Sequence, residues 1–377
     1  MKYTRMVLIS WICFASAAWA QGNSPNNWSE FLRTNMARYN PYETVLGVDN
    51  VPYLQLKWSF EAGTDDLSSP SVAGGRVFYQ QNTAYGYVYA VDANTGDLLW
   101  DVPGGASPTQ IAVENNTIYY GDGYCCIVAL DAATGAGVWS FDSTSGWAAS
   151  PTVLNGVVYI GGNNGGLWAV ANGGQVWYDG LPGAASAPAV VNGVAYFLDD
   201  SNSLDALDAS NGSHLWTQYL GGYVLGSPVV ANGTVYAGTA NMYAFNATTG
   251  AILWSYSTGN EVGTPAVANG VVYVPSGNDL YALNATTGAL EWNTDIGGGV
   301  SAPAVANGVV YVGAQISYTG NRAGDALFAL NASTGAVLWS YRPEMKQPTY
   351  ANVSPSVANG MVYFVCANTQ ICAFGLK

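Results

Sequence analysis

One eleven-residue pattern recurs along the chain and constrains its fold more than any other feature. Six copies begin with Ala and end ten residues later with Trp, as in ALNATTGALEW, and a Thr-Gly or Asn-Gly pair stands between them. Two further tryptophans close partial copies, so eight tryptophans mark eight equivalent positions. They are Trp58, Trp100, Trp139, Trp177, Trp216, Trp254, Trp292 and Trp339. A unit of roughly 40 residues is one supersecondary element that buries its apolar face by packing on its neighbours.

A second signal recurs between the tryptophans. It is a Ser, Thr or Ala followed by Pro and a short apolar run, with Pro at positions 70, 108, 151, 188, 228, 265, 303 and 355. Each unit then reads as four short strands, of the types APAVANG, VVYV, LYALN and ALEW, which alternate as strands do. The Asn-Gly after the first strand supplies the positive φ angles of a two-residue hairpin. Helical repeats are therefore excluded.

Eight units of four strands predict an all-β fold, an eight-bladed β-propeller of four-stranded antiparallel blades. The repeat region begins with a fourth strand at Trp58 and ends after a third strand at Phe374. The N-terminal strand should therefore complete the last blade and close the ring. We assign residues 53–377 to this propeller.

The segment before the ring contains two parts. Residues 1–20 hold Lys2 and Arg5, an apolar run and Ala18-Trp19-Ala20, which is the layout of a cleavable signal peptide. The sequence thus predicts an exported protein, either periplasmic or secreted. Residues 21–52 are expected to form a packed lead-in segment, and Asn27 to Glu30 have the spacing of a helix capping box.

The charge of the chain excludes one class of partner. Removal of Lys2 and Arg5 with the signal leaves 8 basic residues against 24 acidic ones, a formal charge of −16. Nucleic acid and anionic membranes are poor partners for such a surface. No stretch after the signal approaches the roughly 20 apolar residues of a membrane span.

Four cysteines follow the signal: Cys125, Cys126, Cys366 and Cys372. An even number in an exported protein favours disulfides, and the sequence permits three pairings. Cys366 and Cys372 flank the short connection between the second and third strands of the last unit, which favours a local disulfide. Cys125 and Cys126 are adjacent, and the residues alone leave open two ordinary cysteines or a bridge elsewhere.

The Ala to Trp pattern with its Asp/Asn and Thr-Gly, repeated with an eightfold count, resembles the PQQ-like repeat family. This family includes quinoprotein alcohol dehydrogenases and the BamB propeller of outer-membrane protein assembly. The resemblance covers residues 53–377 and implies that Cys125 and Cys126 form a disulfide that stacks on a quinone. PQQ with calcium is the cofactor set it implies, but the family's catalytic aspartate and calcium ligands match no position here.

Common catalytic sets are absent from the sequence. His214 is the only histidine, and it lies near the turn before Trp216. A Ser-His-Asp triad, a histidine zinc site and a CxxCH haem attachment therefore lack the residues that they require. The chain holds no Walker loop and no EF-hand pattern. These absences favour a non-catalytic protein.

The non-repeated loops are the remaining candidates for binding. In a propeller the loops that follow the second and fourth strands of each blade share one face, called the loop face below. The two longest insertions, residues 314–326 and 341–353, fall on it. The candidate ligand-binding residues there and in the other loops of this face are Cys125, Cys126, Trp147, Tyr318, Arg322, Arg342, Lys346 and Tyr350. A basic, aromatic spot on an acidic protein favours a small carboxylate-bearing ligand or a protein partner.

Three functions follow as hypotheses. The first is a non-catalytic binding or protein-interaction module that uses the loop face, and it requires no cofactor or metal. The second is a compact PQQ-dependent alcohol or sugar dehydrogenase, and the third is a BamB-like outer-membrane assembly factor.

Overall fold

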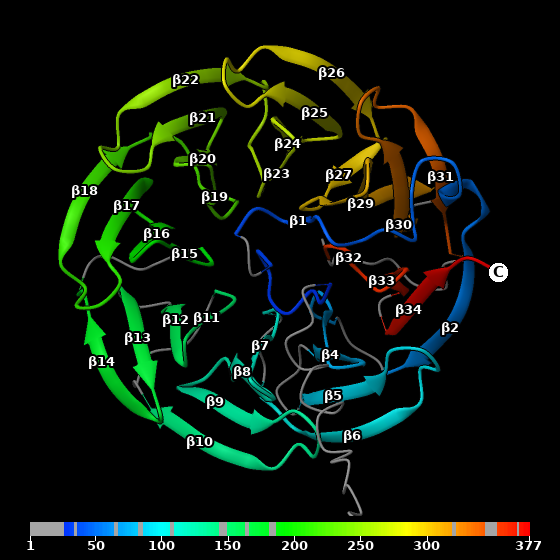
Figure 1. The fold of residues 1–377 in the computed structure, drawn as a ribbon, viewed down its shortest axis with the longest axis horizontal. Helices are drawn as coiled ribbons and strands as arrows, with labels where there is room; N and C mark the ends of the chain where they lie inside the picture. Colours follow the sequence, from blue (N-terminus) through cyan, green and yellow to red (C-terminus); the bar gives the residue numbers. More distant parts are fainter. Residues whose placement is uncertain are drawn as a thin grey trace, which may run out of the picture.

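The computed structural model describes residues 26–33, 36–63, 67–81, 86–105, 109–142, 149–162, 166–180, 186–318, 322–343, 353–367 and 369–377. These residues form a ring of eight antiparallel sheets around a central hub (Figure 1). The predicted eight-bladed propeller is confirmed. The one helical element in the described part is the short 3₁₀ turn η1 (Val51–Tyr53). No helix among the described residues is long and apolar enough to cross a membrane. The predicted signal peptide, residues 1–20, lies outside the described residues.

Each blade runs from an inner strand A at the hub to an outer strand D at the rim. The A strands are β3 (Ser71–Ala73), β7 (Ala112–Glu114), β11 (Thr152–Leu154), β15 (Ala189–Val191), β19 (Val229–Ala231), β23 (Ala266–Ala268), β28 (Ala304–Ala306) and β32 (Ser356–Ala358). The B strands are β4 (Arg76–Gln80), β8 (Thr117–Gly121), β12 (Val157–Gly161), β16 (Val194–Leu198), β20 (Thr234–Gly238), β24 (Val271–Ser276), β29 (Val309–Tyr318) and β33 (Met361–Ala367).

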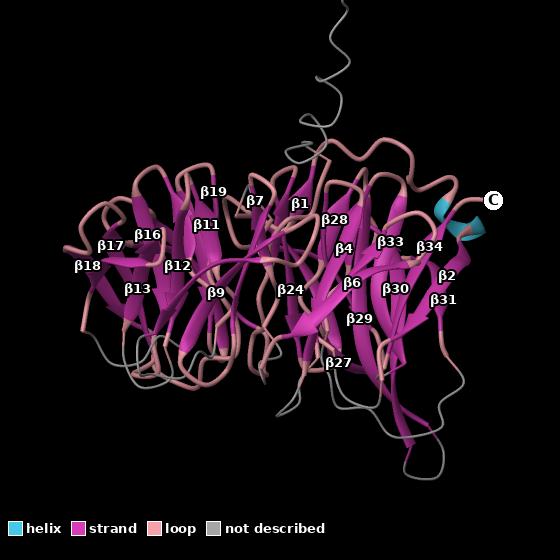
Figure 2. Ribbon diagram, turned by 90° about the horizontal axis from the view of Figure 1, so that it is seen from below, coloured by secondary structure: helices cyan, strands magenta, loops and turns pink. Residues whose placement is uncertain are grey.

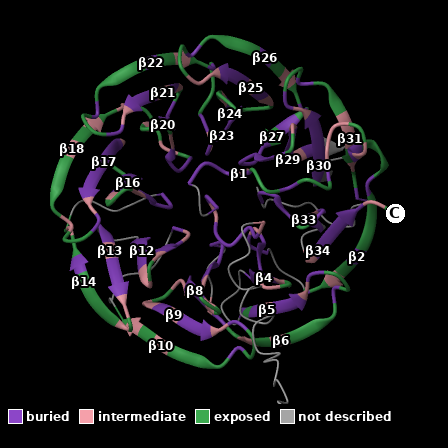
Figure 3. Ribbon diagram, in the orientation of Figure 1, coloured by how far each residue is buried: buried purple, intermediate pink, exposed green. Residues whose placement is uncertain are grey.

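The outer half of each blade holds the C and D strands. The C strands are β5 (Tyr87–Asp92), β9 (Cys126–Asp131), β13 (Leu167–Ala171), β17 (Ser203–Asp208), β21 (Asn241–Asn246), β25 (Asp279–Asn284), β30 (Arg322–Asn331) and β34 (Gln370–Gly375). The D strands are β6 (Leu98–Pro103), β10 (Gly137–Asp142), β14 (Gly174–Tyr178), β18 (His214–Tyr219), β22 (Ile252–Ser257), β26 (Leu290–Asp295), β31 (Val337–Tyr341) and β2 (Gln55–Glu61). Burial falls from the hub to the rim, where the D strands are largely exposed (Figure 3).

The ring closes as the sequence predicts. Strand β2 from the N-terminal side pairs antiparallel with β34, with Trp58 opposite Ala373. The eighth blade is therefore built from both ends of the repeat region, in the order β2-β34-β33-β32. A closed ring leaves no blade without two neighbours to pack against.

The repeated tryptophans join neighbouring blades. The Trp254 indole donates to the Ala285 carbonyl of the next blade at 2.9 Å, and a Cβ on Gly288 would lie 2.7 Å from the Trp254 ring. The ring thus covers the Thr-Gly turn, where Gly288 has a φ of +71° and only glycine leaves room. Matching indole bonds are made by Trp58, Trp100, Trp177, Trp216 and Trp292.

A tyrosine of strand B shares this contact. Tyr236 donates its hydroxyl to the same Ala285 carbonyl at 3.2 Å, and its ring lies 6.0 Å from that of Trp254. Tyr159, Tyr196, Tyr273 and Tyr363 make the same kind of bond in their blades. The aromatic pair therefore acts as one interblade unit.

The hub is filled by residues 26–46, which we call the hub segment. Its backbone accepts hydrogen bonds from inner strands in succession: Trp28 from Val72, Ser29 from Val113, Met36 from Val230, Ala37 from Val267 and Arg38 from Val305, at 2.6–3.0 Å. Its short strand β1 (Tyr39–Asn40) runs parallel to β28, and the Asn40 amide donates to the Val357 carbonyl at 2.8 Å. The segment thereby pairs with inner strands around most of the ring.

The capping-box expectation for Asn27 to Glu30 is wrong. These residues form no helix, because Trp28 pairs with Val72 in a β-bridge and its side chain is fully buried. The Glu30 carboxylate accepts from the Val153 amide of the third blade at 3.1 Å instead of capping a helix. Tertiary pairing with open strand edges outweighs the local helix signal here.

The insertion predicted as a loop at 314–326 is mostly strand. Strands β29 and β30 extend it into a two-stranded ribbon that projects from the loop face (Figure 2), with Tyr318 opposite Arg322 at its end. An added strand, β27 (Gly298–Val300), pairs with β29. Backbone pairing with β27 explains why this insertion is ordered as a sheet and not as an open loop.

Candidate functional site

A cavity of about 1030 Å³ occupies the centre of the loop face. Its wall comes from the connections that enter strand A and from B–C loops, with small side chains such as Ala240, Thr264 and Ala302. Phe31 of the hub segment contributes to its lining from the side of the hub. Among the described lining residues Glu261 is the one charged side chain, and it is exposed.

Hydroxyl side chains next to the repeated prolines form hydrogen bonds between neighbouring blades in this wall. Ser150 accepts a hydrogen bond from the Gln110 amide at 3.0 Å, Thr264 from the Ser227 amide at 2.8 Å, and Ser69 from the Ser354 amide at 2.9 Å. Each bond crosses from one blade to the next. The Ser/Thr-Pro step is visible in the sequence, but its role as an interblade link is not.

Two buried ionisable side chains, Arg38 and Glu30, lie in the hub segment next to the cavity residue Phe31. Arg38 is fully buried, and its guanidinium donates to the Pro303 carbonyl at 2.7 Å and to the Phe31 carbonyl. It also lies 4.7 Å from the centre of the Phe31 ring, a cation–π arrangement that fixes the ring. Burial lowers the pKa of Arg38 to about 9. Burial also raises the pKa of Glu30 from 4.5 to about 8, so this carboxyl is largely neutral at pH 7.

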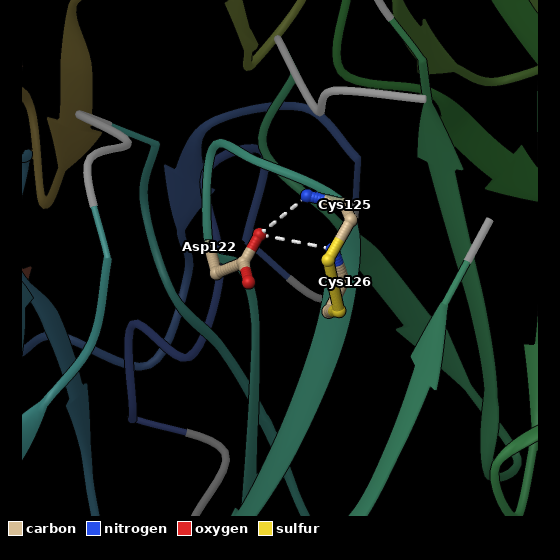
Figure 4. A group of neighbouring side chains, drawn as sticks. All are labelled: Asp122, Cys125 and Cys126. Atoms are coloured by element: carbon tan, nitrogen blue, oxygen red, sulfur yellow. Dashed lines mark hydrogen bonds between the residues drawn. A yellow bond between two sulfur atoms is a disulfide. The ribbon is translucent and has the colours of Figure 1, made fainter. Parts of the chain in front are cut away.

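Cys125 ends the loop between β8 and β9, Cys126 is the first residue of β9, and their sulfur atoms are paired (Figure 4). The Asp122 carboxylate accepts from the backbone amides of Tyr124, Cys125 and Cys126 through Oδ1, at 2.9–3.0 Å. Both cysteines are half-buried, and neither belongs to the lining of the central cavity. The pair is therefore a separate feature of the same face.

The structure describes some of the other predicted ligand-binding residues and not others. Trp147, Lys346 and Tyr350 lie outside the described residues. Tyr318 and Arg322 are paired in the backbone register at the end of the β29–β30 ribbon. Arg342 is exposed, and its guanidinium lies 5.6 Å from the centre of the Phe328 ring. The structure therefore brings Tyr318 and Arg322 together and places Arg342 on the outer part of the same blade.

The remaining cysteines and the single histidine lie elsewhere. Cys366 and Cys372 are paired across β33 and β34 and are 1% exposed. His214 begins strand β18 and is not a turn residue, and its Nε2 lies 2.6 Å from the Thr217 hydroxyl and 3.8 Å from the Asp205 carboxylate. This polar group lies at the rim, far along the blade from the hub cavity.

The described residues do not fit a PQQ and calcium site in the cavity. Calcium takes six to eight oxygen ligands. In the described part of the chain, the one group of three Asp, Glu, His or Cys side chains with converging ligand atoms is Asp122, Cys125 and Cys126. The cavity wall contributes a single described carboxylate, that of Glu261.

Fold and repeat together define the class: an eight-bladed propeller of PQQ-like repeats with its hub filled from the N-terminal side. The family model described as outer membrane protein assembly factor BamB matches residues 84–178, 169–264 and 240–377. The chain belongs to this PQQ-like, BamB-type repeat family. The predicted resemblance is confirmed.

Curated relatives and solved structures include both dehydrogenases and BamB. Lupanine 17-hydroxylase (cytochrome c) of Pseudomonas sp. is 26% identical over 56% of this chain and 30% of its own length. Polyvinylalcohol dehydrogenase of Sphingopyxis sp. is 24% identical over 62% of this chain and 39% of its own length. The chain thus spans less than half the length of these two relatives.

Two solved structures show the same fold. BamB from Moraxella catarrhalis matches with a TM-score of 0.70 and 19% identity, over 86% of this chain and 98% of BamB. The quinohemoprotein alcohol dehydrogenase ADHIIG of Pseudomonas putida matches with a TM-score of 0.74 and 16% identity, over 95% of this chain and 81% of that enzyme.

Proposed function

We propose that this protein is an exported, non-catalytic binding module that receives its ligand or protein partner at the loop face. The observation that carries the proposal is the central cavity of about 1030 Å³, which Phe31 of the hub segment lines on one side and whose described wall holds mostly uncharged side chains. Ligand sites are typically concave, with a few polar groups among small and apolar ones. A ring with a cavity of this size at the centre of one face fits recognition.

The site has two parts in this proposal. The cavity is the deeper one, with Glu261 and Leu225 at positions where the side chains are exposed. The loops of the seventh and eighth blades form its rim, and there Arg322, Arg342, Lys346 and Tyr350 would receive carboxylates of a ligand or an acidic partner. Trp147, Cys125 and Cys126 belong to the same face.

A screen with cavity-blocked protein tests this proposal. Small carboxylates, amines and polyols are screened by thermal shift, and proteins from a cell-envelope extract are captured on the purified chain. Leu225→Trp with Glu261→Lys should abolish a genuine interaction, because both side chains are exposed in the cavity lining and their replacement leaves the core intact. Tyr219→Ser is the matched control, because the Tyr219 side chain is 73% exposed at the end of the outer strand β18, outside the cavity lining.

The outcomes separate clearly. Binding that survives in the Tyr219 variant and is lost in the blocked variant supports the proposal. Binding that is equal in both variants, or no binding from any source, refutes it. Alanine replacement of Arg322, Arg342 and Tyr350 tests the rim in the same assay, and an unchanged affinity would remove the rim from the site.

A second candidate is a compact PQQ-dependent alcohol or sugar dehydrogenase. The paired, adjacent cysteines on the loop face favour it, as do relatives whose names identify them as quinone-linked dehydrogenases. Addition of PQQ and calcium to the purified protein should then give a quinone absorption band and dye-linked oxidation of alcohols or sugars. If neither the absorption band nor oxidation is seen at saturating PQQ and calcium, the dehydrogenase function is refuted and the binding module remains.

A third candidate is an outer-membrane assembly factor. It is favoured by the family description and by the match to 98% of the Moraxella BamB chain. Capture of an outer-membrane assembly complex by the tagged protein would support it. Export itself is tested by the N-terminus of the purified protein, which should be Gln21 if residues 1–20 are removed.

A further inference from the structure

The Asp122, Cys125 and Cys126 group is the strongest feature that the proposed function leaves unused. The ligand atoms of these three side chains lie within 4.8 Å of one another. Asp122 and Cys125 lie in the connection between β8 and β9 and Cys126 begins β9, so the three side chains come from one short stretch of the chain. Two sulfurs and one carboxylate form a donor set suited to a soft cation.

The carboxylate is fixed beside the sulfurs. Three backbone amides, those of Tyr124, Cys125 and Cys126, converge on Oδ1 of Asp122. Figure 4 shows the bonds from Cys125 and Cys126. These bonds fix the orientation of the carboxylate. The second oxygen, Oδ2, stands outside these three bonds and is the one that could bind a cation.

The connection is also held from outside. Gln80 of the first blade donates to the Gly104 carbonyl at 2.9 Å and to the Gly121 carbonyl at 3.3 Å. Gly105 packs on the Asp122 backbone so closely that a Cβ there would overlap the Asp122 carbonyl. Two neighbouring segments therefore hold the end of β8 and the Asp122 backbone in place, in addition to the bond between the sulfurs.

We propose that the reduced Cys125–Cys126 pair, together with Asp122, binds one soft divalent cation, and that pairing of the two sulfurs closes this site. Thiolates are the sulfur form that binds metals, and a disulfide offers none. The two states exclude each other, so the site is controlled by the redox state of the pair.

The chemistry balances with a dithiol or phosphine reductant. Two electrons from the reductant break the sulfur–sulfur bond and the two sulfurs take up protons. A dithiol leaves as its own disulfide, and a phosphine leaves as its oxide, with the oxygen taken from water. A divalent cation then displaces the two thiol protons and is held by two thiolates and the Asp122 carboxylate.

The second cysteine pair provides an internal contrast. Cys366 and Cys372 are 1% exposed in the core of the eighth blade, whereas Cys125 and Cys126 are half-buried. Among the described residues no carboxylate joins Cys366 and Cys372 in a group of three ligands. Reduction should therefore create a cation site at the first pair and not at the second.

Titration of the full purified chain with Cd²⁺ tests the proposal. After phosphine reduction and removal of oxygen, the protein should bind one Cd²⁺ with a thiolate-to-cadmium charge-transfer band, and the oxidised protein should show none. Cys125→Ser should abolish the band. Asp122→Asn keeps an oxygen that can accept the three amide bonds, but should weaken binding at least about tenfold, the lower range for loss of a metal-site partner.

The control is the double variant Cys366→Ala, Cys372→Ala, in which the band should persist unchanged. Loss of the band in this variant, or its persistence in Cys125→Ser, would place the site elsewhere and overturn the proposal. Equal Cd²⁺ binding by oxidised and reduced protein would overturn it as well. Near-ultraviolet circular dichroism of each variant shows that the ring is intact, and Asp122→Asn with unchanged affinity would remove the carboxylate from the site.

Discussion

The ring wall and the hub segment are held by opposite kinds of contact. The wall repeats one interblade unit, an indole and a tyrosine hydroxyl on a shared carbonyl with a glycine beneath the indole, as in Trp254, Tyr236 and Gly288. The hub segment has no repeated unit. Its residues Ser29, Met36 and Ala37 each accept a backbone hydrogen bond from a different blade. Loss of one wall contact is local, whereas loss of the hub segment affects most blades together.

Deletion of residues 26–46 should have the largest effect. Six inner-strand amides would lose their partners, those of Val72, Val113, Val153, Val230, Val267 and Val305. At about 1 kcal/mol for each bond, the loss is at least about 6 kcal/mol, before the burial of Trp28 is counted. This is comparable with the whole stability of a domain. Calorimetry should show no cooperative unfolding transition near the melting temperature of the intact chain. An unchanged melting temperature would contradict the role of the segment.

Breaking one wall contact should cost less. Trp254→Ala is expected to destabilise the protein by about 3–5 kcal/mol, the usual cost of removing a large buried aromatic side chain. Gly288→Ala should cost about 1–3 kcal/mol more than Gly270→Ala. Both glycines have positive φ, but only at Gly288 would the new Cβ meet an indole ring. Urea denaturation measures both, and equal costs at the two glycines would mean that the indole contact is unimportant.

The buried Glu30 makes the stability of the hub depend on pH. Its pKa is raised to about 8, mainly by burial, so the folded state holds a proton that the unfolded state releases near pH 4.5. The associated stabilisation is complete below pH 4.5 and is lost as the pH rises toward 8. Glu30→Gln should therefore stabilise the protein at pH 8 by on the order of 3 kcal/mol relative to pH 4.5. A difference in melting temperature that does not vary with pH would contradict the burial of this carboxyl.

The smallest effect is expected at the outer part of the seventh blade. Arg342→Ala removes a cation–π contact with Phe328 at an exposed site, which is worth about 0.5–1 kcal/mol. Urea denaturation should detect little change, while binding of a carboxylate-bearing ligand at the rim should weaken. A large loss of stability would show that Arg342 is part of the wall and not of the rim.

The repeat allowed most of the ring to be predicted from sequence. The eight tryptophans predict the blade number, and the Asn-Gly turns, present in six of the eight units, predict the hairpins. The C-terminal strand at Phe374 predicts the closure through β2, because it leaves the last unit one strand short. The Asn-Gly turns do adopt positive φ, as at Asn269 and Gly270.

The hub could not be predicted in the same way. A capping-box spacing at Asn27 to Glu30 predicts a helix, but open strand edges at the hub compete for the same backbone. The cavity depends on Phe31 and on residues from many blades that meet only in three dimensions. Loop parity placed the 314–326 insertion on the loop face, but no local pattern indicates the cavity at the centre of that face.

Hydrogen exchange of the intact chain tests the account most directly, because the central claim is that the hub segment pairs with the inner strands and closes the cavity on that side. The amides of Val113, Val230, Val267 and Val305 should exchange as slowly as those of Val235 and Val272, which lie fully buried in the B strands. Exchange of the inner-strand amides as fast as that of exposed rim residues would show that the hub is open, and would contradict the account.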